Sequence, residues 1–220
     1  MRIARKIAAL AAGTALVAGS MLAAAPGASA GGTTGGQKVV DALVSGYGDG
    51  SNGNPYDFQI VTTAVIRTEL VPTLASLDGI TVFAPNDRAF EVLANKLGLL
   101  GPNYRYGATV DEDKIVAALL TLPNAVATIK AIVLYHVFTG GAVDGAAATA
   151  LPVFGTRLMM ANGQKLGITN FTRFTGTPTL ILGDKDGSFF NDYVVKSKVN
   201  VIKVDGAVVH GISDVLLPTL

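Results

Sequence analysis

The residues of this chain best suited to chemistry are one aspartate, Asp87, and two histidines, His136 and His210. Asp87 stands where a predicted buried strand passes into a helix, a position at which many enzymes place catalytic groups. A carboxylate that met a histidine there could serve as a general acid–base pair. The two histidines lie in separate segments without a helically spaced partner, so the sequence predicts no zinc site on a helix face.

The motifs of common enzyme classes are missing from the part of the chain that follows Gly31. That part contains neither a G-x-S-x-G nucleophile elbow nor a phosphate-binding G-x-x-x-x-G-K-[ST] loop. The chain has no cysteine, so thiol nucleophiles, thiolate metal ligands and disulfides are all excluded. A hydrolase that uses Asp87 and His136 is kept as an alternative hypothesis. No cofactor and no metal ion are expected.

Structural roles explain the same residues more simply. Asn86 precedes a predicted helix and can cap it, which places Asp87 in the first turn, where the helix dipole favours negative charge. His136 alternates with Leu134 and Phe138 along a predicted strand. A single histidine on such an apolar face is typical of a protein core, so the sequence favours a protein that is not an enzyme.

Residues 1–30 have the pattern of a secretory signal peptide. Three basic residues precede an apolar, alanine-rich segment of bacterial type, which ends in the small residues Ala28-Ser29-Ala30. Cleavage is predicted after Ala30. A flexible Gly/Thr segment, 31–36, and a single domain, 37–220, are expected to follow it.

The charge and hydropathy of the remaining chain exclude two classes of partner. Removing the three basic residues of the signal peptide from a net charge of +1 leaves −2. No basic run indicates a nucleic-acid partner, and no later apolar segment is long enough to span a membrane. The expected product is secreted and extracellular, and without disulfides it must be held together by core packing.

The first half of the domain has the apolar periodicity of helices, interrupted by a short buried strand at 81–84. A loop rich in Gly and Asn, 46–55, contains Asp49, Ser51 and Asn52, which resemble calcium ligands but lack the spacing of an EF-hand. This loop is therefore interpreted as an ordinary connection. The predicted helices cover 37–45, 57–77 (divided at Pro72), 86–97, 111–122 and 123–132.

The second half of the domain has the pattern of strands. Turn signals occur at Asn162-Gly163, 184–187 and Asp205-Gly206. Residues 193–204 are predicted to form one long strand with a bulge near Val201. The predicted strands cover 134–138, 158–160, 164–168, 179–182, 193–204 and 207–212. Helices followed by strands indicate an α+β fold with a mostly antiparallel sheet.

Three motifs occur in order along the chain. They are TVFAPNDRAF at Thr81–Phe90, VLYHV at Val133–Val137, and DGAVVHGISDVLLP at Asp205–Pro218. Together they resemble the signatures of the fasciclin-like (FAS1) domain family, over about residues 37–218. The segments 98–112 and 169–192 look longer than in a minimal member of that family.

The resemblance implies a FAS1 fold, a wedge-shaped antiparallel two-sheet β-sandwich packed against several helices of the N-terminal half. It implies extracellular or cell-surface life and a role in adhesion or matrix contact, and it does not imply catalysis. It also implies that the acidic residue of the first motif hydrogen-bonds the histidine of the Tyr-His motif, which would pair Asp87 with His136. The sequon at Asn170 is expected to be unused.

We therefore expect a secreted, non-catalytic adhesion or interaction protein with one FAS1 domain, whose partner is an extracellular or cell-surface protein or glycan. The alternative is a secreted carrier of small ligands or glycans, indicated by aromatic residues in the two long segments. Local packing of these aromatic residues is a further interpretation. The residues considered for an interaction surface are Tyr104, Tyr106, Tyr135, His136, Phe171 and Phe174.

Overall fold

The structure is a computed structural model that describes residues 32–48, 50–176, 179–184 and 192–219. The predicted signal peptide lies outside these residues, as does most of the predicted turn at 184–187. Among the described residues, no helix combines the length and the apolar character that crossing a membrane requires.

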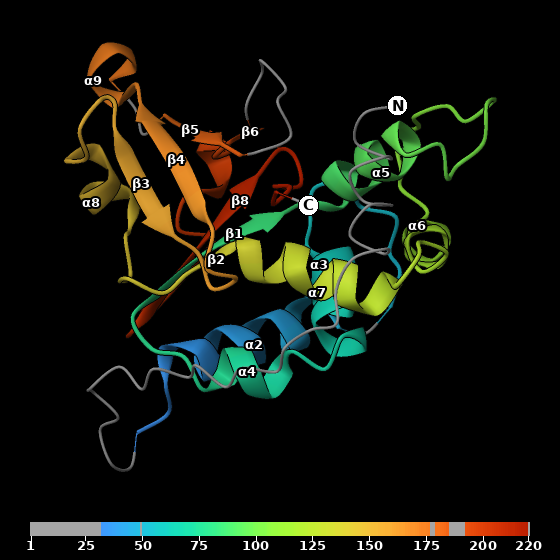
Figure 1. Cartoon of the computed structure of the whole chain (residues 1–220), viewed down its shortest axis with the longest axis horizontal. Helices are drawn as coiled ribbons and strands as arrows, with labels where there is room; N and C mark the ends of the chain where they lie inside the picture. Colours follow the sequence, from blue (N-terminus) through green and yellow to red (C-terminus); the bar gives the residue numbers. More distant parts are fainter. Residues whose placement is uncertain (1–31, 49, 177–178, 185–191, 220) are drawn as a thin grey trace.

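The helices of the N-terminal half gather on one side of the molecule, and α8 and α9 lie on the other (Figure 1). The predicted division at Pro72 is confirmed, since α3 ends before it and α4 contains it. The described helices are α2 (Gly35–Tyr47), α3 (Gln59–Arg67), α4 (Val71–Ala75), α5 (Asp87–Lys96), α6 (Glu112–Leu119), α7 (Ala125–Tyr135), α8 (Gly145–Thr149), α9 (Thr172–Thr175) and the 3-10 turn η1 (Lys196–Lys198).

Two four-stranded sheets make up the rest of the fold. Sheet A lies between the N-terminal helices and sheet B (Figure 1). Sheet A has the order β2 (Val137–Phe138), β1 (Ile80–Pro85), β8 (Ala207–Ile212), β7 (Ile202–Val204). Sheet B has the order β3 (Thr156–Met159), β4 (Lys165–Asn170), β5 (Leu180–Gly183), β6 (Asp192–Tyr193). This arrangement confirms the predicted α+β class and the two sheets packed against N-terminal helices.

One strand pair departs from the expected antiparallel pattern. β1 and β8 run parallel, in a register that pairs Ile80 with Ala207 and Pro85 with Ile212. The other neighbouring strands in both sheets are antiparallel. Parallel pairing requires a long crossover, and here the described part of the crossover contains α5 to α9, η1 and all of sheet B. The first and last sequence motifs therefore lie side by side at the centre of sheet A.

Sheet A contributes to two hydrophobic cores, because successive residues of a strand face opposite sides. Ile80 and Val209 pack with the helices in the larger core. Phe83 and Ile212 face sheet B and pack with its strands in the smaller core. The other buried hydrophobic residues of the smaller core are Tyr135, Ala148, Leu158, Met160, Leu166, Ile168, Leu180, Leu182, Val194 and Leu216.

Residues 34–36 are ordered into α2, which corrects the prediction of a flexible segment over 31–36. The Thr34 side chain caps the helix by accepting a hydrogen bond from Gln37 N at 3.1 Å. Gly35 N donates to Asp78 Oδ1 at 2.8 Å, and Gly36 N donates to the Leu77 carbonyl at 2.9 Å. The glycines are needed for close packing, since both are buried against neighbouring backbone.

The sequence predicted that the Tyr-His motif belongs to a strand, but in the structure the motif ends α7. Tyr135 is the last helical residue and His136 is its C-cap, so β2 begins only at Val137. The His136 side chain satisfies the carbonyl of Ile132, one of the carbonyls that a helix end leaves without a backbone partner. The helix therefore continues to Tyr135, into the segment 134–138 where alternating apolar residues predicted a strand.

The predicted long strand over 193–204 is also wrong. The chain leaves sheet B after β6, passes through η1, and joins sheet A as β7. Asn200 adopts a left-handed conformation with φ of 54°, which ends any extended run next to the position of the predicted bulge. The two-residue turn at Asp205-Gly206 is confirmed, because Val204 pairs with Ala207.

Candidate functional site

Asp87 is fully buried at the first position of α5. The predicted cap is confirmed, since Asn86 Oδ1 accepts a hydrogen bond from Ala89 N at 2.9 Å. Asp87 Oδ1 accepts a hydrogen bond from Ile60 N at 2.8 Å. The carboxylate therefore connects α5 to the first turn of α3, and its partner is not His136.

His136 makes two hydrogen bonds to backbone groups. Its Nε2 accepts from Leu216 N at 2.9 Å, so its Nδ1 carries the proton and donates to the Ile132 carbonyl at 2.7 Å. Complete burial lowers the pKa of His136 to about 4, against a smaller opposing effect of the Ile132 carbonyl. The expected Asp87–His136 hydrogen bond is wrong, because the extension of α7 turns the imidazole toward the C-terminal segment.

The other residues of this region are structural as well. Tyr135 is fully buried and its hydroxyl donates to the Lys165 carbonyl at 3.2 Å. His210 Nδ1 accepts from Asn200 N at 3.1 Å, and its Nε2 lies 2.8 Å from the Val143 carbonyl. Burial lowers the pKa of His210. Tyr135 and His136 are therefore not available as an interaction surface, contrary to the expectation from sequence.

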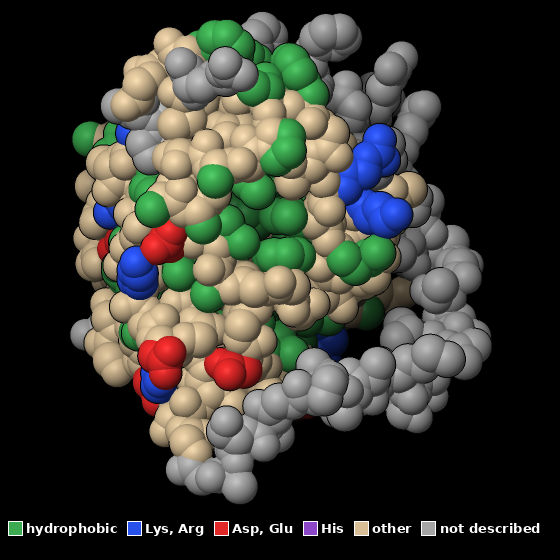
Figure 2. All heavy atoms as spheres, turned by 90° about the vertical axis from the view of Figure 1, so that its left-hand side faces the viewer, with side chains coloured by type: hydrophobic (Ala, Val, Ile, Leu, Met, Phe, Trp, Pro, Cys, Tyr) green, Lys and Arg blue, Asp and Glu red, His purple; other side chains and the backbone are tan. Residues whose placement is uncertain are grey.

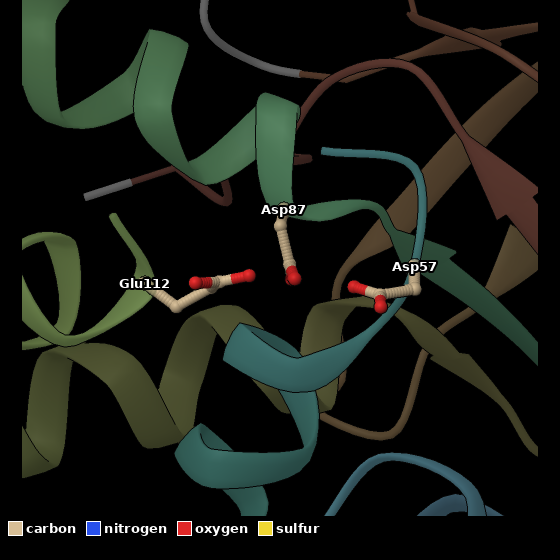
Figure 3. Close-up of side chains that lie close together, drawn as sticks. All are labelled: Asp57, Asp87 and Glu112. Carbon is tan, nitrogen blue, oxygen red and sulfur yellow. The ribbon is translucent and has the colours of Figure 1, made fainter. Parts of the chain in front are cut away.

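Asp87 belongs to a cluster of three buried carboxylates. Asp57, Asp87 and Glu112 each provide an oxygen atom, and these atoms all lie within 4.8 Å of one another. Figure 3 shows the side chains pointing toward one another, with Asp87 between the other two. We call these three residues the acidic cluster. Among the described residues they are the set whose carboxylate oxygens could share one metal ion.

The acidic cluster lies at the N-terminal ends of three helices. Asp57 precedes α3, while Asp87 and Glu112 are the first residues of α5 and α6. Helix dipoles stabilise negative charge at these positions. Nevertheless, burial raises the pKa of Asp87 well above its usual range, and the neighbouring Asp57 and Glu112 raise it further.

Sequence reasoning did not single out Asp57 or Glu112. Each lies in the first turn of a predicted helix, Asp57 in 57–77 and Glu112 in 111–122. The one feature of the sequence that could have pointed to these residues is that each carboxylate stands at the start of a helix, next to its row of apolar residues. Their meeting point depends on how the helices pack, and periodicity carries no information on that packing.

The tyrosines of segment 98–112 pack against α5. The Tyr104 hydroxyl donates to the buried carboxylate of Glu91, which also forms an ion pair with Arg88. Asn95 Nδ2 donates to the Tyr106 hydroxyl at 2.9 Å, and the two tyrosine rings lie 5.9 Å apart. These contacts support the interpretation that the aromatic residues of this segment pack locally.

Segment 169–192 contributes to an exposed group of aromatic residues. Phe154 and Phe174 are each 69% exposed. Both lie against Phe171, with ring centroids 6.3 and 6.1 Å away. We call Phe154, Phe171 and Phe174 the aromatic tip. Because it includes Phe154, which precedes β3, the tip combines two segments that are separate in sequence.

The side of the molecule formed by α8, α9 and sheet B carries hydrophobic side chains at its top and centre. Figure 2 shows them there, with the charged side chains of this face at its left and right edges and in its lower part. The exposed large hydrophobic residues of this part of the chain include Phe154, Met159 and Phe174. Contiguous exposed apolar side chains are typical of interaction sites.

The sequon asparagine is buried inside the same part of the fold. Asn170 is 3% exposed. Its Nδ2 donates to the carbonyls of Leu151 at 2.8 Å and Ala148 at 3.0 Å. A glycan needs that nitrogen and open space, so the folded chain has no room for glycosylation at Asn170.

Two concave surfaces lie on the described part of the chain away from the aromatic tip. A groove lined by apolar side chains of α3, α5, α6 and α7 encloses about 30 Å³, far less than the roughly 300–1,000 Å³ of typical small-molecule sites. A wider hollow of about 500 Å³ lies between Ala142 and the β7–β8 hairpin, where Lys203 Nζ pairs with Asp144 Oδ2 at 2.6 Å. Neither surface is lined by a histidine or by a residue of the acidic cluster.

The chain resembles known fasciclin domains. A solved FAS1 domain pair from the insect cell adhesion molecule Fasciclin I matches 70% of this chain, with 14% sequence identity and a TM-score of 0.45. The match spans 43% of that chain. None of the curated proteins compared matches. The model of the Fasciclin domain matches residues 56–218, about three quarters of the sequence. The chain therefore belongs to the fasciclin domain family, a family of extracellular adhesion-type domains.

Proposed function

We propose that this protein is secreted, has no catalytic activity, and adheres to extracellular or cell-surface material through one fasciclin domain. The signal-peptide pattern of residues 1–30 supports secretion. The partner is a protein or glycan of a cell surface or matrix.

The placement of the titratable groups supports a role without catalysis. Asp87, His136 and His210 are all buried, and each is hydrogen-bonded to backbone groups. None of them meets another in a dyad that could transfer a proton to or from a substrate. This arrangement argues against a hydrolase built on Asp87 and His136.

The observation that carries the proposal is the aromatic tip. Phe154 and Phe174 are the most exposed large hydrophobic residues of the described chain. Aromatic residues clustered on a surface are typical anchors of protein interfaces, because they bury much apolar area with little loss of conformational entropy. Exposing them to water is unfavourable unless a partner covers them.

Replacing both phenylalanines with serine is expected to weaken adhesion about tenfold or more, since anchor residues dominate binding energy. The measurement is retention of the purified chain on cell-surface and matrix material, followed by mass-spectrometric identification of what it binds. Stability is expected to change by less than about 0.5 kcal/mol for each exposed substitution. Thermal unfolding checks this second expectation.

Val126→Ser provides the matched control. Val126 lies on α7 and is 52% exposed, so this variant removes an exposed apolar side chain away from the tip. The control is expected to be retained as well as the unmodified chain. Equal retention of the double variant would show that the tip is not the binding surface. If the unmodified chain itself binds nothing above background, the adhesion proposal is wrong.

A carrier of small ligands is the second candidate, and the apolar groove lined by α3, α5, α6 and α7 is the candidate site for its ligand. Its small volume means that a ligand would have to open it further. A thermal-shift screen of apolar ligands tests this function, because a ligand that binds only the folded chain raises its melting temperature. Absence of any stabilising ligand would eliminate the carrier.

A further inference from the structure

Two oxygen atoms of the acidic cluster have no hydrogen-bond partner. Asp57 Oδ1 and Asp87 Oδ2 are the buried side-chain atoms left unpaired among the described residues. Asp57 is 6% exposed and Asp87 is completely buried. Burying a carboxylate oxygen without a partner is unfavourable, and native structures rarely do so without a reason. Figure 3 shows the carboxylate groups of Asp57, Asp87 and Glu112 directed toward one another.

The remaining oxygens of the cluster are held in place by neutral donors. Ile60 N donates to Asp87 Oδ1 at 2.8 Å, and Asn52 Nδ2 donates to Asp57 Oδ2 at 2.8 Å. Gly53 N donates to Glu112 Oε1 at 2.9 Å. These bonds fix the orientation of the three carboxylates, as outer hydrogen bonds do around metal ligands.

The negative charge of the cluster is not balanced by a basic side chain. The ion pairs among the described residues involve Asp144, Asp205, Asp214 and Glu91, and none of them includes a residue of the cluster. The donors named above are neutral amides, and the hydroxyl of Ser51, which bonds Glu112, is also neutral. Three carboxylates therefore share a buried space without a positive charge.

We propose that the acidic cluster binds one calcium ion through Asp57, Asp87 and Glu112. The donors are all oxygen atoms, which hard cations such as Ca²⁺ prefer, and no histidine or cysteine is present to favour zinc. Ca²⁺–oxygen distances are about 2.4 Å. Two ligands of one such ion can lie at most about twice that distance apart, and the carboxylate oxygens lie within 4.8 Å.

Residues 50–54 of the Gly/Asn-rich loop lie next to the cluster. Gly50, Ser51 and Asn52 are exposed, while Asp57 is buried. Ser51, Asn52 and Gly53 are hydrogen-bonded to the cluster, so only this short segment separates it from solvent. This placement was not predicted, because the sequence offered no EF-hand spacing.

A proton competes with the metal ion, because a carboxylate must be deprotonated to bind a metal. Calcium must displace this proton, so its affinity is expected to rise with pH. The measurement is accordingly made at pH 8, where competition is weaker than at pH 6.

The purified full chain is treated with a chelator, and CaCl₂ is added while thermal unfolding and binding heat are recorded. We expect one ion per chain. The melting temperature should rise by about 3–6 °C when Ca²⁺ is present at about ten times its Kd. NaCl at equal ionic strength should give no comparable rise, and MgCl₂ should give a smaller one, because Mg²⁺ dehydrates reluctantly.

Asp57→Asn and Asp87→Asn test the assignment to this cluster. Both substitutions keep the size of the side chain and an oxygen acceptor, so the variants are expected to fold, and both should lose the rise caused by Ca²⁺. Asp113→Asn, in the exposed first turn of α6, is the matched control and should keep it.

Three outcomes would overturn the proposal. The first is an unmodified chain whose melting temperature does not respond to millimolar Ca²⁺ at pH 8. The second is an equal response in the two asparagine variants, which would place the ion elsewhere. The third is an equal response to MgCl₂, which would contradict calcium as the preferred ion.

Discussion

Gly36→Ala is expected to destabilise the protein by about 3 kcal/mol, although alanine favours helices more than glycine does. Gly36 lies in the first turn of α2, where that helix contacts the end of α4. A Cβ atom at this position would overlap the Leu74 carbonyl oxygen and would lie 2.7 Å from the Leu77 carbonyl oxygen. Both atoms belong to the backbone, so relief requires α2 and α4 to move apart.

Gly46→Ala in the same helix is the matched control. A Cβ atom at Gly46 would meet no atom within 4 Å. This variant is expected to gain about 0.5–1 kcal/mol from the helix propensity of alanine. Urea denaturation of the two variants measures both values. A gain in stability for Gly36→Ala would mean that α2 and α4 are not packed as the structure has them.

Acidification from pH 6.5 to pH 4 is expected to remove about 3 kcal/mol of stability through His136 alone. Burial holds the pKa of His136 at about 4 in the folded chain, against an ordinary value of 6.5. Each pKa unit corresponds to about 1.4 kcal/mol. The unfolded chain binds the proton first as the pH falls, so this contribution is complete above pH 6.5 and is lost toward pH 4.

The hydrogen bonds of His136 explain why its protonation destabilises the folded chain. Its Nε2 must accept a hydrogen bond from Leu216 N, and protonation would replace that acceptor with a second donor. The bond attaches the C-terminal segment to the end of α7. His136→Ala is consequently expected to lower the melting temperature strongly, because it leaves a buried N–H group unpaired and creates a cavity.

His136→Gln separates titration from packing. Glutamine retains one acceptor and one donor group but does not titrate between pH 4 and 6.5. Guanidinium unfolding of this variant at pH 7 and pH 4.5 is expected to show a smaller loss on acidification than the unmodified chain shows. His210 and the carboxylates are common to both proteins and cancel in the comparison. Equal losses would show that His136 is not the group that titrates.

The sequence predicted the local features of the fold well. The cap at Asn86 and the two-residue turn at Asp205-Gly206 were predicted correctly, because both depend on neighbouring residues. The motif resemblance also indicated the family correctly. The strand predicted over 193–204 failed, since the chain there passes between two sheets and alternation alone cannot reveal the change.

Contacts between distant segments could not be derived in this way. The sequence drew attention to Asp87 and His136, but their partners are Ile60 and Leu216. The resemblance implied that these two residues bond each other, and the geometry of α7 prevents it. Which of several buried groups meet depends on small rotations of packed helices, and many such rotations are compatible with the same apolar pattern.

The sequence by itself determined the helical and strand-forming halves, the caps and turns, and the family. These features follow from periodicity and from side chains acting on their own backbone. Only the tertiary structure decided that Asp57, Asp87 and Glu112 converge, and that Phe154 joins Phe171 and Phe174 at an exposed tip. Both groupings bring together side chains from separate elements, and packing alone sets the distances between them.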